Sequence, residues 1–117
     1  MTITRIQPGP RMSQAVIHGD TVYLAGQIAP EPDEASVADQ TRQVLARIDA
    51  MLAEAGTDKS RLLSATIWLT DMAAFAEMNA VWDAWVAPGC APARATVEAR
   101  LAAPRFLVEI MVVAARS

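Results

Sequence analysis

The sequence of 117 residues has one cysteine, one histidine and no long uninterrupted run of apolar residues. Because Cys90 stands alone, no intrachain disulfide framework is expected, and no group of cysteine and histidine has the spacing of metal ligands. No apolar run reaches the about 18 residues that a membrane-spanning helix needs, and the first ten residues lack the apolar core of a signal peptide. We therefore expect a soluble cytoplasmic protein without a structural metal.

Basic residues are also few, with 10 Lys and Arg against 13 Asp and Glu, which gives a formal net charge of −3. Such a balance lacks the basic surface that proteins use to bind nucleic acid, so the expected partner is a small molecule. The one histidine, His18, stands beside a predicted turn and offers no acid–base pair for cleaving RNA.

Apolar residues, by contrast, make up 53% of the chain, and charged residues only 20%. A chain of this length is expected to form one hydrophobic core, so residues 1–117 are predicted to be a single domain. The apolar content is high for a soluble monomer, and obligate subunit interfaces resemble a core cut in half. We therefore expect an oligomer.

The hydrophobic pattern predicts strands toward both ends of the chain and two helices between them. Gly19-Asp20 separates two β-rich runs and predicts a two-residue hairpin. Ser36 predicts the start of the first helix, and Gly56 its end. The remaining predicted elements are a strand over 61–71 with Leu63 on its inner face, a helix capped by Asp71 and ended by Pro88, and two strands over 94–101 and 106–115 joined as a hairpin by a turn at Ala103-Pro104.

This order of elements indicates an α+β sandwich, in which two helices cover one face of a mostly antiparallel or mixed sheet. The other face of such a sheet is left without a covering layer. In a chain with surplus apolar surface, another copy of the chain is expected to cover that face, and closed symmetric rings are the usual result. The arrangement allows a site to form between subunits.

Two charged residues lie in strand patterns that are otherwise apolar. Glu109 shares its face of the last strand with three apolar residues. Because a buried, unpaired carboxylate is costly, Glu109 has either a structural ion pair with Arg94, Arg100 or Arg105 or a functional role. Arg94, at the mouth of the preceding strand, either joins such a pair or holds a small carboxylate by two parallel hydrogen bonds. Glu98 is expected to pair with an arginine.

Six segments of the sequence follow one another in the order and at the spacings of a known family: GPRMSQAV, YLAGQIA, QTRQVLARIDAMLAEAG, DMAAFAEMNAVW, APARATVE and VEI. On these segments, which span nearly the whole chain, the protein resembles the RidA family, also called YjgF/YER057c/UK114. The resemblance implies a chorismate-mutase-like α+β fold that assembles as a homotrimer with three clefts between subunits. It also implies hydrolysis of reactive 2-imino or 2-enamino acids to 2-oxo acids and ammonium, without a metal or organic cofactor.

The same resemblance implies roles for individual residues. Arg94 matches the arginine that binds the substrate carboxylate, and Glu109 matches the acid that positions the attacking water. Asn79 matches an asparagine of the cleft, and Gly26 a glycine whose backbone lines it.

Two further candidate substrate-binding residues depart from the family pattern. Met12 stands where many members have a tyrosine, and Thr96 where many have a cysteine. Thr96 still offers a hydroxyl group, whereas Met12 has no phenol to hydrogen-bond a substrate or water. Met111 also replaces an acidic residue that is common in the closing strand. These departures favour the same reaction on an imino acid with a bulkier or more apolar side chain.

Two other functions are weighed against hydrolysis. A protein that binds small carboxylates without turnover, or a chaperone-like protein, would use Arg94 equally well. Glu109 distinguishes the cases, because a second carboxylate repels a bound anion but supplies a base for hydrolysis. Ribonuclease activity, which has been attached to parts of the family, fits an acidic chain with one histidine poorly.

Overall fold

The computed structural model describes residues 1–116, which form a six-stranded sheet and two α-helices. The elements are β1 (Ile3–Pro8), β2 (Ser13–His18), β3 (Thr21–Leu24), α1 (Val37–Glu54), β4 (Leu62–Leu69), α2 (Phe75–Trp85), β5 (Ala93–Glu98) and β6 (Val108–Ala115). Their order across the sheet is β1-β2-β3-β6-β4-β5, and β4 and β5 are its one parallel pair within the described residues.

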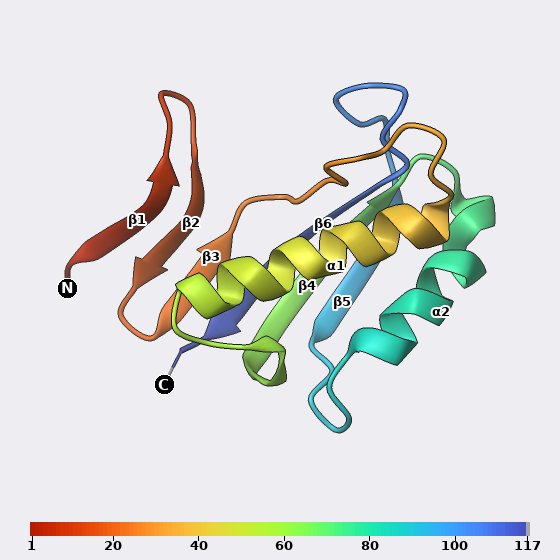
Figure 1. Cartoon of the computed structure of the whole chain (residues 1–117). Coiled ribbons are helices and arrows are strands. Elements are labelled where there is room, and N and C mark those ends of the chain that lie inside the picture. Colours follow the sequence, from red (N-terminus) through yellow and green to blue (C-terminus); the bar gives the residue numbers. More distant parts are fainter. Residues whose placement is uncertain (117) are drawn as a thin grey trace.

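Both helices lie on the same face of this sheet (Figure 1). Apolar residues on the inner faces of the helices and the strands form the core, among them Val44, Ile48, Leu52, Ile67, Met78 and Ile110. The predicted α+β sandwich with a mixed sheet is therefore confirmed. Neither helix of residues 1–116 combines the length and the apolarity needed to cross a membrane.

Local sequence sets both ends of α1 as predicted, whereas α2 has no side-chain cap of its own. Ser36 caps α1, because its hydroxyl oxygen accepts a hydrogen bond from the Asp39 N–H at 3.1 Å. Gly56 follows the end of the helix with a φ of 85°, in the left-handed region that glycine adopts without strain. Asp71 caps a short 3-10 turn, Met72–Ala74, which leads directly into α2.

The last two strands do not form the predicted hairpin. β5 ends at Glu98, β6 begins at Val108, and β4 lies between the two in the sheet. β5 instead runs parallel to β4, because α2 crosses over from the end of one strand to the start of the other. The alternation of side chains identifies both strands, but it carries no information about which strand each one pairs with.

Two other differences concern strand positions. The sequence pattern does not predict β1, an edge strand whose residues are exposed apart from half-buried Ile6, so that no alternating burial marks it. In β4, a bulge between Leu62 and Ser64 leaves Leu63 50% exposed and turns Leu62 inward instead. The predicted hairpin at Gly19-Asp20 does join β2 to β3.

The sheet face opposite the helices has no covering layer in residues 1–116. The strand register places Tyr23 of β3, Met111 of β6 and Val97 of β5 on this face, and each is at least 36% exposed. We call it the open face. Its apolar character agrees with the expectation of a second copy packed against it, which stays a prediction for the assembled protein.

Candidate functional site

Arg94 lies on β5 and points to the helix side of the sheet. In the parallel register it stands beside buried Ala65. The carbon of its guanidinium group lies 5.3 Å from the ring centroid of Trp82 and 5.9 Å from that of Phe75, both on α2. The aromatic rings hold the cation by cation–π attraction. No carboxylate within residues 1–116 forms an ion pair with it.

Two side chains on the same two elements each have a buried oxygen without a hydrogen-bond partner in residues 1–116. Asn79 Oδ1 and Thr96 Oγ1 are the buried side-chain polar atoms of the described chain that lack one. Thr96 follows Arg94 by two residues on the same face of β5, and Asn79 lies on the face of α2 that carries Phe75 and Trp82. An unpaired buried polar atom costs about 1–3 kcal/mol, so a bound ligand or water that pairs these atoms would be stabilised. We call Arg94, Asn79 and Thr96 the Arg94 cluster.

Glu109 lies near the start of β6 on the open face, opposite Trp68 of β4. Its carboxylate packs against Gly26, in the segment that follows β3. A Cβ atom on residue 26 would overlap Oε2 of Glu109 and would lie 3.0 Å from its Cδ. Any other residue at position 26 would therefore displace the carboxylate, so the small size of glycine is what this contact requires.

Burial raises the pKa of the Glu109 carboxyl above its ordinary value, because desolvation disfavours the charged form. No ion pair with Arg94, Arg100 or Arg105 offsets this cost within the part of the chain that the structure describes. The structural pairing considered from the sequence is therefore absent from the single chain. A carboxyl group with a raised pKa is typical of residues that transfer protons.

Glu98 has a structural role that differs from the predicted one. Its Oε1 accepts a hydrogen bond from the Met72 N–H at 2.8 Å. Since Met72 opens the turn that leads into α2, the carboxylate satisfies one of the free N–H groups at this helix start. No arginine within residues 1–116 forms an ion pair with Glu98, so the predicted pairing is not found in the single chain.

Arg94 and Glu109 lie on opposite faces of the sheet. Arg94 shares a face with Ala65, whereas Glu109 shares a face with Trp68. Residues 65 and 68 are an odd number of positions apart on β4, so their side chains point to opposite sides. A single chain therefore does not bring Arg94 and Glu109 together, and one molecule could bind both only between two copies of the chain.

Met12 and Gly26 line a cavity of about 420 Å³ beside the end of the sheet. We call it the Met12 cavity. Met12 is 50% exposed in the loop between β1 and β2. Arg47 of α1 and Arg105, from the segment before β6, also line this cavity, and the sequence pattern assigned neither to a site. A helical period places Arg47 on the flank of α1 but does not indicate which distant segment it faces.

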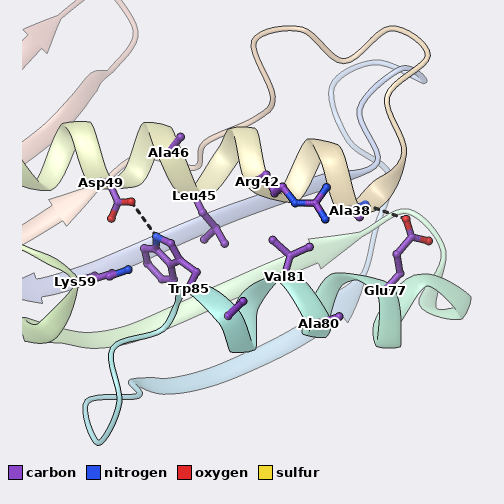
Figure 2. Close-up of a pocket in the computed structure, with 11 residues that line it drawn as sticks. Ala38, Arg42, Leu45, Ala46, Asp49, Lys59, Glu77, Ala80, Val81 and Trp85 are labelled. Carbon is purple, nitrogen blue, oxygen red and sulfur yellow. Dashed lines mark hydrogen bonds between the residues drawn. The ribbon is translucent and has the colours of Figure 1, made fainter.

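A larger cavity, of about 550 Å³, lies between α1 and α2 (Figure 2). Polar groups along it are satisfied within the chain: Trp85 Nε1 donates to Asp49 Oδ2 at 2.9 Å, and Glu77 Oε2 accepts from the Ala38 N–H at 2.9 Å. None of the predicted site residues lines it. The groups suited to chemistry therefore lie in the Arg94 cluster and around Glu109 rather than in this groove.

The sequence profile of the family described as Endoribonuclease L-PSP matches residues 2–116 of the chain. The chain belongs to this family, also named YjgF and RutC. The RutC family protein YoaB of Escherichia coli strain K12 is 50% identical over 115 residues, which cover 98% of this chain and 99% of that protein. A RutC family protein of Haemophilus ducreyi is 50% identical over 113 residues, which cover 97% of this chain and 96% of that protein.

Solved structures of a YjgF family protein and of an uncharacterized protein have the same fold. A YjgF family protein from Neisseria meningitidis superimposes with a TM-score of 0.96 at 48% identity, covering 100% of this chain and 97% of that one. An uncharacterized protein from Pseudomonas aeruginosa superimposes with a TM-score of 0.95 at 42% identity, covering 99% of this chain and 100% of that one. The resemblance found in the sequence is confirmed at the level of family and fold. The family description names an endoribonuclease, whereas the names of these four relatives specify no reaction.

Proposed function

We propose that the protein hydrolyses reactive 2-imino or 2-enamino acids to 2-oxo acids and ammonium, in clefts between the subunits of a homotrimer. The observation that carries the proposal is the division of the candidate residues between two sheet faces. A cation with unpartnered polar neighbours lies on one face, and a desolvated carboxylate lies on the other. The Arg94 cluster includes no general base, and no cation within residues 1–116 forms an ion pair with Glu109. Packing of one copy of the chain against the next would bring the two groups together.

The Arg94 cluster has the groups needed to hold a 2-imino acid. The guanidinium group would receive the substrate carboxylate through two parallel hydrogen bonds, in a geometry that a lysine does not match. Its position against Trp82 and Phe75 restricts its freedom before the substrate arrives. Asn79 Oδ1 can accept a hydrogen bond from the imine nitrogen, and Thr96 Oγ1 can bond a water or the substrate. The substrate is thereby oriented for attack at C2.

Glu109 of the neighbouring subunit would activate the attacking water. As the water oxygen bonds to C2 of the protonated imine, Glu109 accepts a water proton and the C=N π electrons move to nitrogen, which gives a carbinolamine. Glu109 then returns this proton to the nitrogen, the C2–N bond breaks, and the hydroxyl becomes the C=O group by losing its proton to the released ammonia. General acid–base help of this kind contributes about 10²–10⁴ in rate.

Gly26 and Met12 complete the Glu109 side of the proposed cleft. Gly26 leaves room for the carboxylate, and Met12 lines the cavity next to it. Met12 has no hydroxyl to hold the water, so the water would be positioned by Glu109 and by the Arg94 cluster. The proposed reaction uses no metal or organic cofactor.

The open face is the proposed subunit interface. Tyr23, Val97 and Met111 expose apolar surface on it, and burial of such surface stabilises an assembly by about 25 cal/mol for each Å² removed from water. In a closed ring of three copies, each subunit would contribute Arg94 to one cleft and Glu109 to the next, which gives three equivalent sites.

A non-catalytic carboxylate-binding protein is the second candidate. Arg94 has no carboxylate partner within residues 1–116, which favours this function as much as it favours hydrolysis. Glu109 argues against pure binding, because a carboxylate near the ligand would repel the anion. Ribonuclease activity has less support: His18 is exposed beside a hairpin turn, and the net charge of −3 disfavours binding to a phosphate backbone.

The proposal is tested by measuring hydrolysis of 2-imino acids generated in situ from several amino acids by an amino-acid oxidase. The wild type is compared with Arg94→Ala, Glu109→Gln and the control Arg42→Ala, a substitution on α1 away from both halves of the site, after light scattering shows equal assembly. We expect acceleration by the wild type and the control, and a loss of about 10²-fold or more in the two site variants. A wild type that binds small carboxylates through Arg94 but accelerates no imine hydrolysis would establish the binding function instead.

A further inference from the structure

The Met12 cavity contains two arginines that the proposed reaction does not use. Arg47 comes from α1 and Arg105 from the segment before β6, and no aspartate or glutamate of residues 1–116 lines the cavity with them. The cavity also includes Gly26, whose backbone contacts the Glu109 carboxylate. A group bound next to these arginines would therefore lie beside the proposed reaction centre.

Arg47 is fixed by a buried glutamine. Its Nε donates a hydrogen bond to Gln27 Oε1 at 3.1 Å, and Gln27 is 1% exposed. The side-chain nitrogen of Gln27 donates to Gln14 Oε1 at 3.1 Å and to the Ala25 carbonyl at 3.0 Å, so its oxygen is left to face Arg47. Within residues 1–116 no carboxylate pairs with Arg47. The Nη groups of this half-buried cation are thus held in place with no anion to neutralise them.

Arg105 is carried on a backbone that a second buried glutamine holds. Gln40, 0% exposed, donates to the Arg105 carbonyl at 3.0 Å and to the Pro32 carbonyl at 3.2 Å, and it accepts from the Leu107 N–H at 2.9 Å. The segments that contain Pro32 and Arg105, both of which line the cavity, are therefore attached to α1 through the side chain of Gln40. Arg105 itself is exposed, and its guanidinium carbon lies 4.8 Å from the ring centroid of the neighbouring Phe106, a cation–π contact that favours this position of the cation.

Two cations that line one cavity repel each other, and a bound anion removes this repulsion while gaining charge-assisted hydrogen bonds from both. A carboxylate matches the planar fork of a guanidinium group. Glu109, on the other side of Gly26, would repel an anion placed close to it, so the anionic group is expected at the arginine end of the cavity. A ligand that spans the cavity would carry its anionic group at the arginine end and a cationic group, such as a protonated imine, at the end near Glu109.

We propose that the Met12 cavity is a subsite for a second carboxylate, so that the protein prefers 2-imino acids with an acidic side chain. This inference rests on the proposed function, because it assigns the reacting carbon and its own carboxylate to Glu109 and to the Arg94 cluster. It also differs from the expectation, based on the sequence, that the substrate has a bulkier or more apolar side chain. That expectation rested on Met12 and did not include the two arginines that line the same cavity.

The test compares two 2-oxo acids of equal chain length, 2-oxoglutarate and 2-oxopentanoate, which differ in the distal carboxylate. Their dissociation constants for the assembled protein are measured by calorimetry at fixed ionic strength for the wild type, Arg47→Gln, Arg105→Gln and the double variant. Arg42→Gln is the matched control, since it removes a cation of α1 that pairs with Asp39 outside the cavity.

We expect the wild type and Arg42→Gln to bind 2-oxoglutarate about tenfold or more tightly than 2-oxopentanoate, because charge-assisted hydrogen bonds are the strong ones. Arg47→Gln and Arg105→Gln should each lower the ratio of the two dissociation constants, and the double variant should lower it to about twofold or less. Equal affinities in the wild type, or a ratio that survives in the double variant, would overturn the subsite.

Turnover separates this inference from the proposed function. Imines formed from glutamate and from norvaline by suitable oxidases are offered to the same proteins. If the norvaline imine is hydrolysed but neither binding nor turnover favours the acidic ligand, the subsite is wrong and the hydrolase function stands. If neither imine is hydrolysed while the binding ratio behaves as expected, the subsite stands and the hydrolase function is wrong.

Discussion

The backbone of Gly26 lies against the carboxylate of Glu109, with no room for a Cβ atom between them. Gly26→Ala is therefore expected to move the carboxylate away from its position while leaving the core intact. A displacement of about 1 Å at a reacting group costs on the order of 10²-fold in rate, so imine hydrolysis should fall by that factor. The rate is measured together with far-UV circular dichroism and light scattering.

Gly9→Ala is a control for that substitution, because a Cβ on Gly9 would approach only the Met12 carbonyl oxygen, at 3.4 Å. It should retain activity within about twofold, since no group of the proposed reaction moves. Full activity in Gly26→Ala would show that the contact with Gly26 does not position Glu109.

The fall of the hydrolysis rate at acidic pH, which is the acid limb of the pH–rate profile, should reflect protonation of the Glu109 carboxylate. A general base must be deprotonated, and burial raises the pKa of this carboxyl above the ordinary value of 4.5. The catalysed rate, after subtraction of the uncatalysed hydrolysis, is expected to fall as the pH drops through this raised pKa. In Glu109→Gln the remaining activity should lack the limb, and an unchanged limb in that variant would assign it to another group.

The same pKa shift predicts how stability depends on pH. A carboxyl group whose pKa is higher in the folded state adds stability below the unfolded value of 4.5, and this contribution is lost as the pH rises through the folded value. Urea unfolding at fixed protein concentration should therefore show the wild type losing stability relative to Glu109→Gln as the pH rises from 4.5 through the raised folded pKa. Parallel stability curves for the two proteins would contradict the desolvation of Glu109.

The buried glutamine of α1 should be a large stabilising element. Gln40→Leu leaves the Arg105 carbonyl and the Leu107 N–H without their partner, and an unsatisfied buried group costs about 1–3 kcal/mol. We expect a loss of about 2–4 kcal/mol in the free energy of unfolding by urea. Gln43→Leu, which breaks exposed bonds to the Glu31 backbone, should cost less than about 1 kcal/mol. Equal losses would show that the Gln40 bonds do not hold this loop.

Much of this architecture could be predicted from the sequence, because side-chain periodicity and capping residues act locally. Ser36 and Gly56 delimit α1 as expected, and alternation groups Glu109 with apolar residues of its own strand. Pairing depends on distant segments: the position of β5 beside β4 follows from the crossover through α2, and no local pattern specifies it. Arg47 and Arg105 come together for the same reason, through glutamines that a sequence pattern does not connect to them.

Arg94 and Glu109 could be recognised as charges in apolar strands, but their separation required the sheet register. That separation leads to the central claim that each site takes Arg94 from one subunit and Glu109 from the next. The most direct test is complementation between two inactive variants, Arg94→Ala and Glu109→Gln, that are unfolded together, mixed in equal amounts and reassembled.

Each variant assembled alone should be inactive, because each of its clefts lacks one of the two groups. In the mixed oligomers, random assembly around a ring gives an intact cleft at about one interface in four, so about a quarter of the wild-type rate of imine hydrolysis should return. A mixture that stays inactive, although mass spectrometry shows oligomers containing both variants, would mean that both residues of a site belong to one subunit and would contradict the account.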